Sequence, residues 1–123
     1  LNIFNLFDNC NMIFNLLKSK NKETDYKILI KSLQKLDLAL ESQTKTGLVP
    51  IDGNVGVLYK IMCEILILLQ YYKLADSYIS KTIIYLKKEK SLDCSKLIQE
   101  STNISMLLKN LISKNKSKII NKN

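Results

Sequence analysis

The stretch VGVLYKIMCEILILLQ, residues 55–70, decides the fold expected for this chain. It is apolar almost all round, and Lys60 and Glu64 are its only charged side chains. A helix without a polar face belongs in the middle of a helical bundle. A membrane span needs about 18 or more uninterrupted apolar residues, and Lys60 and Glu64, one turn apart, interrupt this run. The stretch therefore predicts a central bundle helix and no transmembrane segment.

Four further segments repeat apolar residues at the spacing of one helical face. They cover about residues 3–17, 24–40, 74–86 and 97–112. Residues 42–50 contain turn-forming residues and the only proline, and they predict a loop. Gly53 and Gly56 are expected in a loop before the third helix. A tight antiparallel reversal is expected near Tyr71 and Tyr72. Ser91 or Asp93 is expected to cap the last helix. Together these features predict an all-α fold, a compact antiparallel five-helix bundle.

The chain has 123 residues, which is the size of one ordinary domain. We expect a single helical-bundle domain over residues 1–113 and a basic, frayed C-terminal tail over residues 114–123. The chain begins at Leu1 rather than Met, which favours a piece of a longer protein.

The net charge of +8 comes from 19 lysines and no arginine. Together with frequent Asn and Ile, this composition is typical of an AT-rich genome. The charge is uneven, because residues 87–123 carry nine lysines against three acids. A basic end of this kind is usually a solvated terminus, and its alternative is a surface for an acidic protein partner or an anionic membrane. The residues of that possible interaction surface are Lys109, Lys114, Lys116 and Lys118.

The sequence favours no enzymatic chemistry. Histidine is absent, which excludes Ser-His-Asp and Cys-His nucleophiles and histidine ligation of zinc. Three widely spaced cysteines without a CxxC pair indicate small core residues in a reducing compartment. Glu64 has Lys60 one turn away, which favours a structural or rim position over a general acid. We therefore predict a non-enzyme with no catalytic residue, metal or cofactor.

Nucleic-acid binding is also disfavoured. Arginine is the preferred residue for phosphate and guanine recognition, and the chain has none. The exposed aromatic candidates for base stacking are few, namely Tyr71, Tyr72 and Tyr85. A steep loss of binding with salt would be the signature of this alternative.

Three segments carry a resemblance to a known family: LQKLDLAL at 33–40, GLVP at 47–50 and LLQYYKLADSYI at 68–79. Together they resemble the five-helix domain shared by the steroid receptor RNA activator protein and the C-terminus of the large outer-cage subunit of the COPII vesicle coat. The positions that match the family pattern are Tyr72, Ala75, Ile79, Lys109, Leu111 and Ile112. The family usually has Trp and Gly where this chain has Ile104 and Leu107.

The resemblance implies a non-enzymatic protein-interaction domain of a COPII outer-coat subunit acting in ER-to-Golgi transport. Its expected partners are other COPII coat subunits, with peripheral contact to an acidic membrane surface, and its expected location is the cytoplasm, at ER exit sites and coated vesicles. Two alternatives stay open. One is a compact helical signalling inhibitor of a large DNA virus, which would need an apolar groove for a partner helix. The other is a transcriptional coactivator-like domain.

Overall fold

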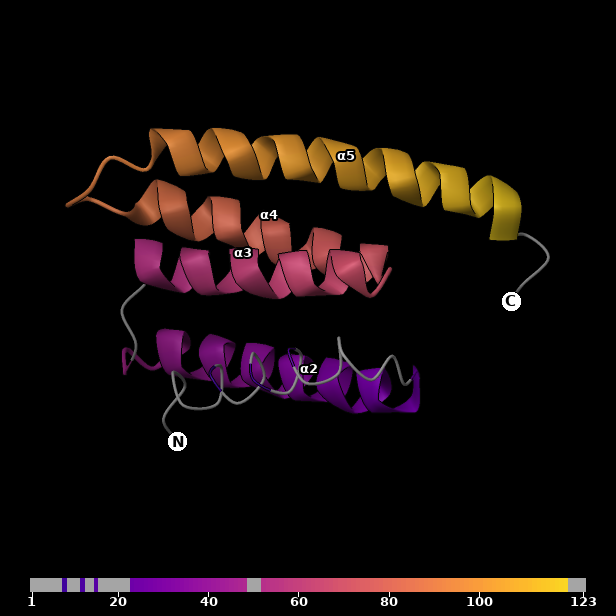
Figure 1. Cartoon of the computed structure of the whole chain (residues 1–123). Coiled ribbons are helices and arrows are strands. Elements are labelled where there is room, and N and C mark those ends of the chain that lie inside the picture. The colour runs from indigo at the N-terminus through magenta and orange to yellow at the C-terminus, as the bar shows by residue number, and fades with distance from the viewer. Residues whose placement is uncertain (1–7, 9–11, 13–14, 16–22, 49–51, 120–123) are drawn as a thin grey trace. The chain divides into compact units, whose positions relative to one another are not determined.

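The computed structural model describes residues 8, 12, 15, 23–48 and 52–119, and their side chains over 26–48 and 52–114 (Figure 1). The chain divides into two compact units, residues 1–50 and 51–123. The described part is all-helical, with four helices and no strand. The helix expected over residues 3–17 falls on residues of which only 8, 12 and 15 are described, so the five-helix count stays a prediction, as does the single domain over 1–113.

The first unit contributes α2, Glu23–Lys45. Its buried stripe contains the four fully buried leucines that the periodicity predicts: Leu29, Leu33, Leu36 and Leu40. The helix runs past Ser42, where we expected a loop, and continues to Lys45. Buried Thr44 satisfies its hydroxyl within the helix, donating to the carbonyls of Leu40 at 2.8 Å and Glu41 at 3.1 Å. The helix ends before Gly47, whose φ of 81° needs no strain in a glycine.

In the second unit, α3 spans Gly53–Leu68 and begins two residues earlier than expected. The Asp52 carboxylate caps it by accepting from the backbone N–H groups of Asn54 at 3.0 Å and Val55 at 3.3 Å. The prediction of a loop at Gly53 and Gly56 is therefore wrong. Gly56 lies where α4 approaches closely, since a Cβ there would stand 3.2 Å from the Thr82 carbonyl oxygen.

The predicted reversal between α3 and α4 is confirmed. Gln70 has a left-handed φ of 66°. The Tyr71 N–H donates to Leu66 O at 2.9 Å and the Gln70 N–H to Ile67 O at 3.0 Å. This pair of bonds is a Schellman motif, with glutamine at the position where glycine is usual. The chain turns here and continues as α4, Tyr72–Lys88.

The contact between α3 and α4 is built from large side chains. Of the apolar residues predicted to face the core on α4, Leu74 is half-buried and the others are buried: Ala75, Tyr78, Ile79 and Leu86. Tyr59 of α3 packs edge-on against Tyr78 and stacks on Tyr85, with ring centroids 5.6 Å apart in both pairs. Such aromatic pairs add stabilisation beyond the area that they bury.

The last helix, α5, spans Ser95–Ile119 and continues six residues past the predicted domain boundary at 113. Asp93, one of the two predicted caps, lies two residues before the helix starts, and its carboxylate accepts from the N–H of the first helical residue, Ser95, at 3.0 Å. Within this unit α4 packs against both α3 and α5, so α4 rather than α3 is the middle helix (Figure 1). Since each connection reverses the chain, α3 and α5 run in the same direction on either side of α4 (Figure 1).

The buried face of α5 matches the predicted leucine stripe only in part. Among the described side chains of α5, those of Ser101, Ser105 and Leu108 are buried. Leu107, which we expected in the core, is 52% exposed. Leu108 belongs to the predicted stripe, and five further residues of that stripe are half-buried: Leu97, Ile98, Ile104, Leu111 and Ile112. The apolar pattern therefore predicted most of this face, but it missed the two buried serines and wrongly included Leu107.

Candidate functional site

The candidate site is an open groove of about 550 Å³ between α3 and α5 of the second unit. On α3 its wall consists of residues one and two turns apart, which are Lys60, Glu64, Ile67 and Leu68. On α5 the facing residues have the same kind of spacing and are Glu100, Asn103 and Ile104. Side chains at i, i+3 and i+4 share one face of a helix, so two continuous helical stripes form the walls.

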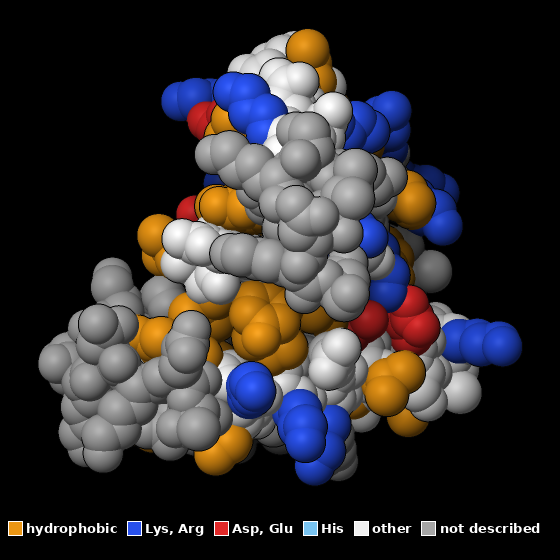
Figure 2. Space-filling view, turned by 90° about the vertical axis from the view of Figure 1, so that its right-hand side faces the viewer, with side chains coloured by type: hydrophobic (Ala, Val, Ile, Leu, Met, Phe, Trp, Pro, Cys, Tyr) orange, Lys and Arg blue, Asp and Glu red, His pale blue; other side chains and the backbone are white. Residues whose placement is uncertain are grey.

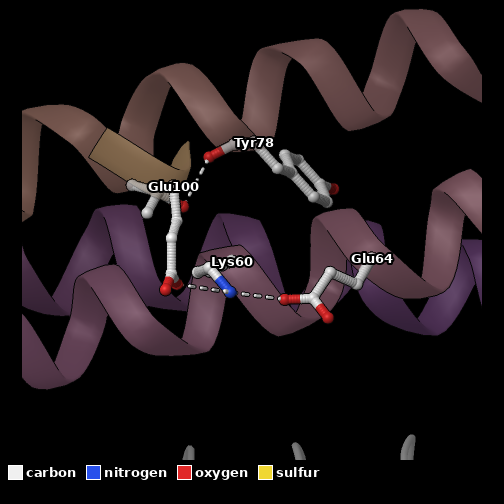
Figure 3. Close-up of polar contacts among 5 residues, drawn as sticks. Lys60, Glu64, Tyr78 and Glu100 are labelled. Carbon is white, nitrogen blue, oxygen red and sulfur yellow. Dashed lines mark hydrogen bonds and ion pairs between the residues drawn. The ribbon is translucent and has the colours of Figure 1, made fainter. Parts of the chain in front are cut away.

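Lys60 lies between two carboxylates that come from different helices (Figure 3). Its Nζ is 2.9 Å from Glu64 Oε1 and 3.9 Å from Glu100 Oε2. The Lys60 side chain is only 18% exposed, whereas those of Glu64 and Glu100 are 49% and 45% exposed. The sequence predicted the Lys60–Glu64 pair, which is confirmed. Glu100 was not foreseen, because its approach depends on how α3 and α5 are placed on α4.

Apart from Asn103, the rest of the wall is apolar and partly open to solvent. Leu68 is 63% exposed at the end of α3, and Ile67 and Ile104 are half-buried. On α5, Leu107 lies one turn beyond Ile104 and is 52% exposed. Apolar side chains that are open to solvent and bordered by charged groups can pack against another molecule.

The groove contains no strong nucleophile among its described lining residues. The nearest thiol in sequence is that of Cys63, which is fully buried on α3. Burial raises the pKa of Cys63 from 9.0 to about 12, and the negative charges of Glu64 and Asp76 add to the shift. A thiol with this pKa is not ionised at neutral pH and is a poor nucleophile. Among the described residues no group of three His, Cys, Asp or Glu side chains could hold a metal ion.

The predicted lysine surface is only partly described. Lys109 is exposed on α5, donates to Ser105 Oγ at 2.8 Å and lies 3.9 Å from Asp76 Oδ1. Lys114 is also exposed. Five residues separate the two, which is about 140° around a helix, so they do not share a face. The side chains of Lys116 and Lys118 lie outside the described residues.

The positions that carry the family resemblance have packing roles. Ala75 and Ile79 are fully buried on α4, and Tyr72 is half-buried at its start. Leu111 and Ile112 are half-buried on α5. Apart from Lys109, none of these positions presents a charged group.

A scan of protein families, a search of curated proteins and a search of solved structures each found no match to this chain. None of the described helices has the length and hydropathy that crossing a membrane requires. The candidate site therefore rests on the geometry of the groove.

Proposed function

We propose that this chain is a non-enzymatic protein-interaction domain that binds an amphipathic helix of a partner protein in the groove between α3 and α5. The observation that carries the proposal is the exposed apolar wall of Ile67, Leu68 and Ile104 between charged side chains. An amphipathic helix that lays its apolar face into such a groove is a common mode of peptide recognition.

The direction of the walls favours a helix over other ligands. α3 and α5 run in the same direction, with their lining residues spaced along each helix. A guest helix lying between them would place side chains at i, i+3, i+4 and i+7 against both walls. It would cover Leu68, which is otherwise 63% exposed, and would give the second unit a fourth helix.

The direct test compares two substitutions of exposed leucines. Leu68→Glu puts a charge on the wall of the groove, and Leu92→Glu puts the same charge on a residue that is 71% exposed before α5. We expect both variants to fold, because neither leucine is buried. The tagged chain and both variants are used to purify partners from the source cells, and co-purifying proteins are identified by mass spectrometry. Partners lost with Leu68→Glu and kept with Leu92→Glu would support binding in the groove; partners kept with both variants would contradict it.

Within this class, the family resemblance supports a finer proposal. The chain would be the C-terminal domain of a COPII outer-coat subunit acting in ER-to-Golgi transport, in the cytoplasm at ER exit sites. The residues that support it are the matches at Tyr72, Ala75 and Ile79 and the Leu111-Ile112 ending. Recovery of other COPII coat subunits in the purification would support this assignment, and their absence would overturn it.

The groove itself favours the second candidate, a helical signalling inhibitor of a large DNA virus. Such an inhibitor requires a surface groove for a partner helix. Recovery of host signalling proteins whose binding depends on Leu68 would favour the inhibitor over the coat subunit.

The lysine-rich end is proposed to steer the domain towards acidic coat, adaptor or membrane surfaces. The test replaces Lys109, Lys114, Lys116 and Lys118 by Gln and measures binding to vesicles that contain anionic lipid and to the recovered partners. Unchanged binding to both would contradict this part of the proposal.

A further inference from the structure

The groove carries the opposite charge balance to the unit that contains it. Residues 51–123 hold twelve lysines and six acidic residues. Lysine side chains stand out across the face shown in Figure 2, where acidic side chains are fewer. The groove instead brings two carboxylates, Glu64 and Glu100, to one lysine, Lys60.

The other four acids of this unit already have local roles. Asp52, Glu89 and Asp93 accept from backbone N–H groups at the ends of helices. Asp76 lies 3.9 Å from Lys109. Glu64 and Glu100 are therefore the two acids of residues 52–119 whose described contacts lie at the groove, and they have one cation between them.

The exposed fractions show which of these charges faces solvent. Lys60 is 18% exposed, so its charge is largely covered, whereas almost half of each glutamate side chain faces solvent. Lys60 Nζ is 2.9 Å from one carboxylate and 3.9 Å from the other, so Glu100 is the less tightly paired acid. A molecule entering the groove meets negative charge on both walls, at Glu64 and Glu100 (Figure 3). The same walls carry the apolar side chains of Ile67, Leu68 and Ile104.

From this arrangement we propose that the partner helix is basic: its apolar face packs on Ile67, Leu68 and Ile104, and Lys or Arg side chains at the edges of that face pair with Glu64 and Glu100. The inference rests on the proposed function of the groove. A cation on one edge of the guest reaches the α3 wall, and a cation on the other edge reaches the α5 wall. An acidic helix of the same apolar pattern would place like charges together and bind less well.

The experiment uses a displayed library of sixteen-residue helices with a fixed leucine face. The residues that flank this face are varied among Lys, Glu and Gln, and the library is sorted on the full chain. Because the two glutamates are half-exposed, we expect lysine-flanked helices to bind about tenfold more tightly than glutamate-flanked ones at low salt. This ratio should narrow as salt rises, since exposed charges are screened.

The matched variants isolate the two carboxylates. Glu64→Gln with Glu100→Gln keeps the shape of both side chains and removes both charges, and the expected result is loss of the preference for lysine with leucine-face binding retained. Glu41→Gln makes the same chemical change on exposed Glu41 of α2 and should leave the preference unchanged.

The outcomes separate this inference from the proposed function. If the chain retains no helix of the library, the proposed function of the groove is wrong. If it retains helices without a preference for lysine, or with one for glutamate, the groove binds a helix but the basic partner is wrong. A lysine preference that survives in the double variant would also overturn the inference, because another surface would then be its source.

Discussion

The two sides of α4 pack against very different surfaces. Towards α3, the contact holds large aromatic side chains, with buried Tyr59 of α3 against buried Tyr78 and half-buried Tyr85 of α4. Towards α5, the buried residues among the described side chains of α5 are Ser101, Ser105 and Leu108. Burial of apolar area is the main source of stability in a folded protein. We infer that the α3–α4 pair carries most of the stability of the second unit, while α5 presents apolar side chains to solvent and to the groove.

The largest expected difference in stability comes from replacing one leucine by alanine on α3 and one on α5. Leu66→Ala empties a fully buried site on α3 and should lower the free energy of unfolding by about 2–5 kcal/mol. Leu107 is 52% exposed on α5, and Leu107→Ala should change the free energy of unfolding by no more than about 0.5 kcal/mol. Urea unfolding of both variants measures the difference. Equal losses would mean that exposed Leu107 stabilises the unit as much as fully buried Leu66, which would contradict the comparison.

A smaller loss of stability is expected at Gly56, where α3 packs closely against α4. Gly56→Ala would place a Cβ 3.1 Å from Leu86 Cγ and 3.2 Å from the Thr82 backbone oxygen. The backbone cannot yield cheaply, so the overpacking outweighs the better helix propensity of alanine and leaves a net loss of about 1 kcal/mol. Asn54→Ala, at an exposed position in the same turn, is the control and should not destabilise. A Gly56→Ala protein as stable as the parent would show that the helices can move apart freely.

On α5, one substitution is expected to raise the free energy of unfolding rather than lower it. Ser101 is fully buried, and its Oγ has no hydrogen-bond partner among the described residues. Ser101→Ala removes that buried hydroxyl and should raise the free energy of unfolding by about 1 kcal/mol. Ser105→Ala is the comparison, because Ser105 Oγ accepts from Lys109 at 2.8 Å and its loss should bring no such gain. Thermal and urea unfolding of both variants measure the difference. Destabilisation by Ser101→Ala would contradict the interpretation that the buried Ser101 hydroxyl lowers stability.

The smallest expected change in stability concerns Glu89, which lies in the α4–α5 connection and hydrogen-bonds to the start of α3. Its carboxylate accepts from the Ser91 and Gly53 N–H groups, both at 3.0 Å. These bonds, that from Ser91 first, hold the pKa of Glu89 below its ordinary value of 4.5. A lowered pKa in the folded state means that the stabilisation is complete above about pH 4.5 and is lost as the pH falls through the folded pKa.

The check is urea unfolding from about pH 6 to about pH 3. Glu89→Gln should have a lower free energy of unfolding than the parent at the higher pH. This difference between the two proteins should disappear towards the lower pH. A gap that stays constant with pH would show that the carboxylate charge does not stabilise the fold.

Much of the helical architecture follows from periodicity in the sequence. The stripes on α2 and α4 were predicted because leucine, isoleucine and tyrosine recur there at helical spacing. The face of α5 was predicted only in part: Leu108 is buried as expected, but an apolar pattern does not include Ser101 and Ser105, which are buried on the same helix. Gly56 was assigned to a loop because glycine is usually a turn residue, although here it serves close packing.

The candidate site was predicted only in part, for a different reason. Lys60 and Glu64 are four residues apart on one helix, so their contact follows from local geometry. Glu100 and Ile104 reach the same groove only because α4 places α5 beside α3, and a single sequence contains no direct signal for that placement. The spacing of Glu100, Asn103 and Ile104 indicates a shared face and not the helix that it meets.

The reversal at Gln70 also has a consequence for the order of folding. Its bonds join residues three and five positions apart, between Gln70 and Ile67 and between Tyr71 and Leu66. Contacts this local close within a small fraction of a millisecond and carry little loop-closure entropy. We therefore expect α3 and α4 to pair first, with α5 adding afterwards across the longer connection, so that the groove is completed in the last step.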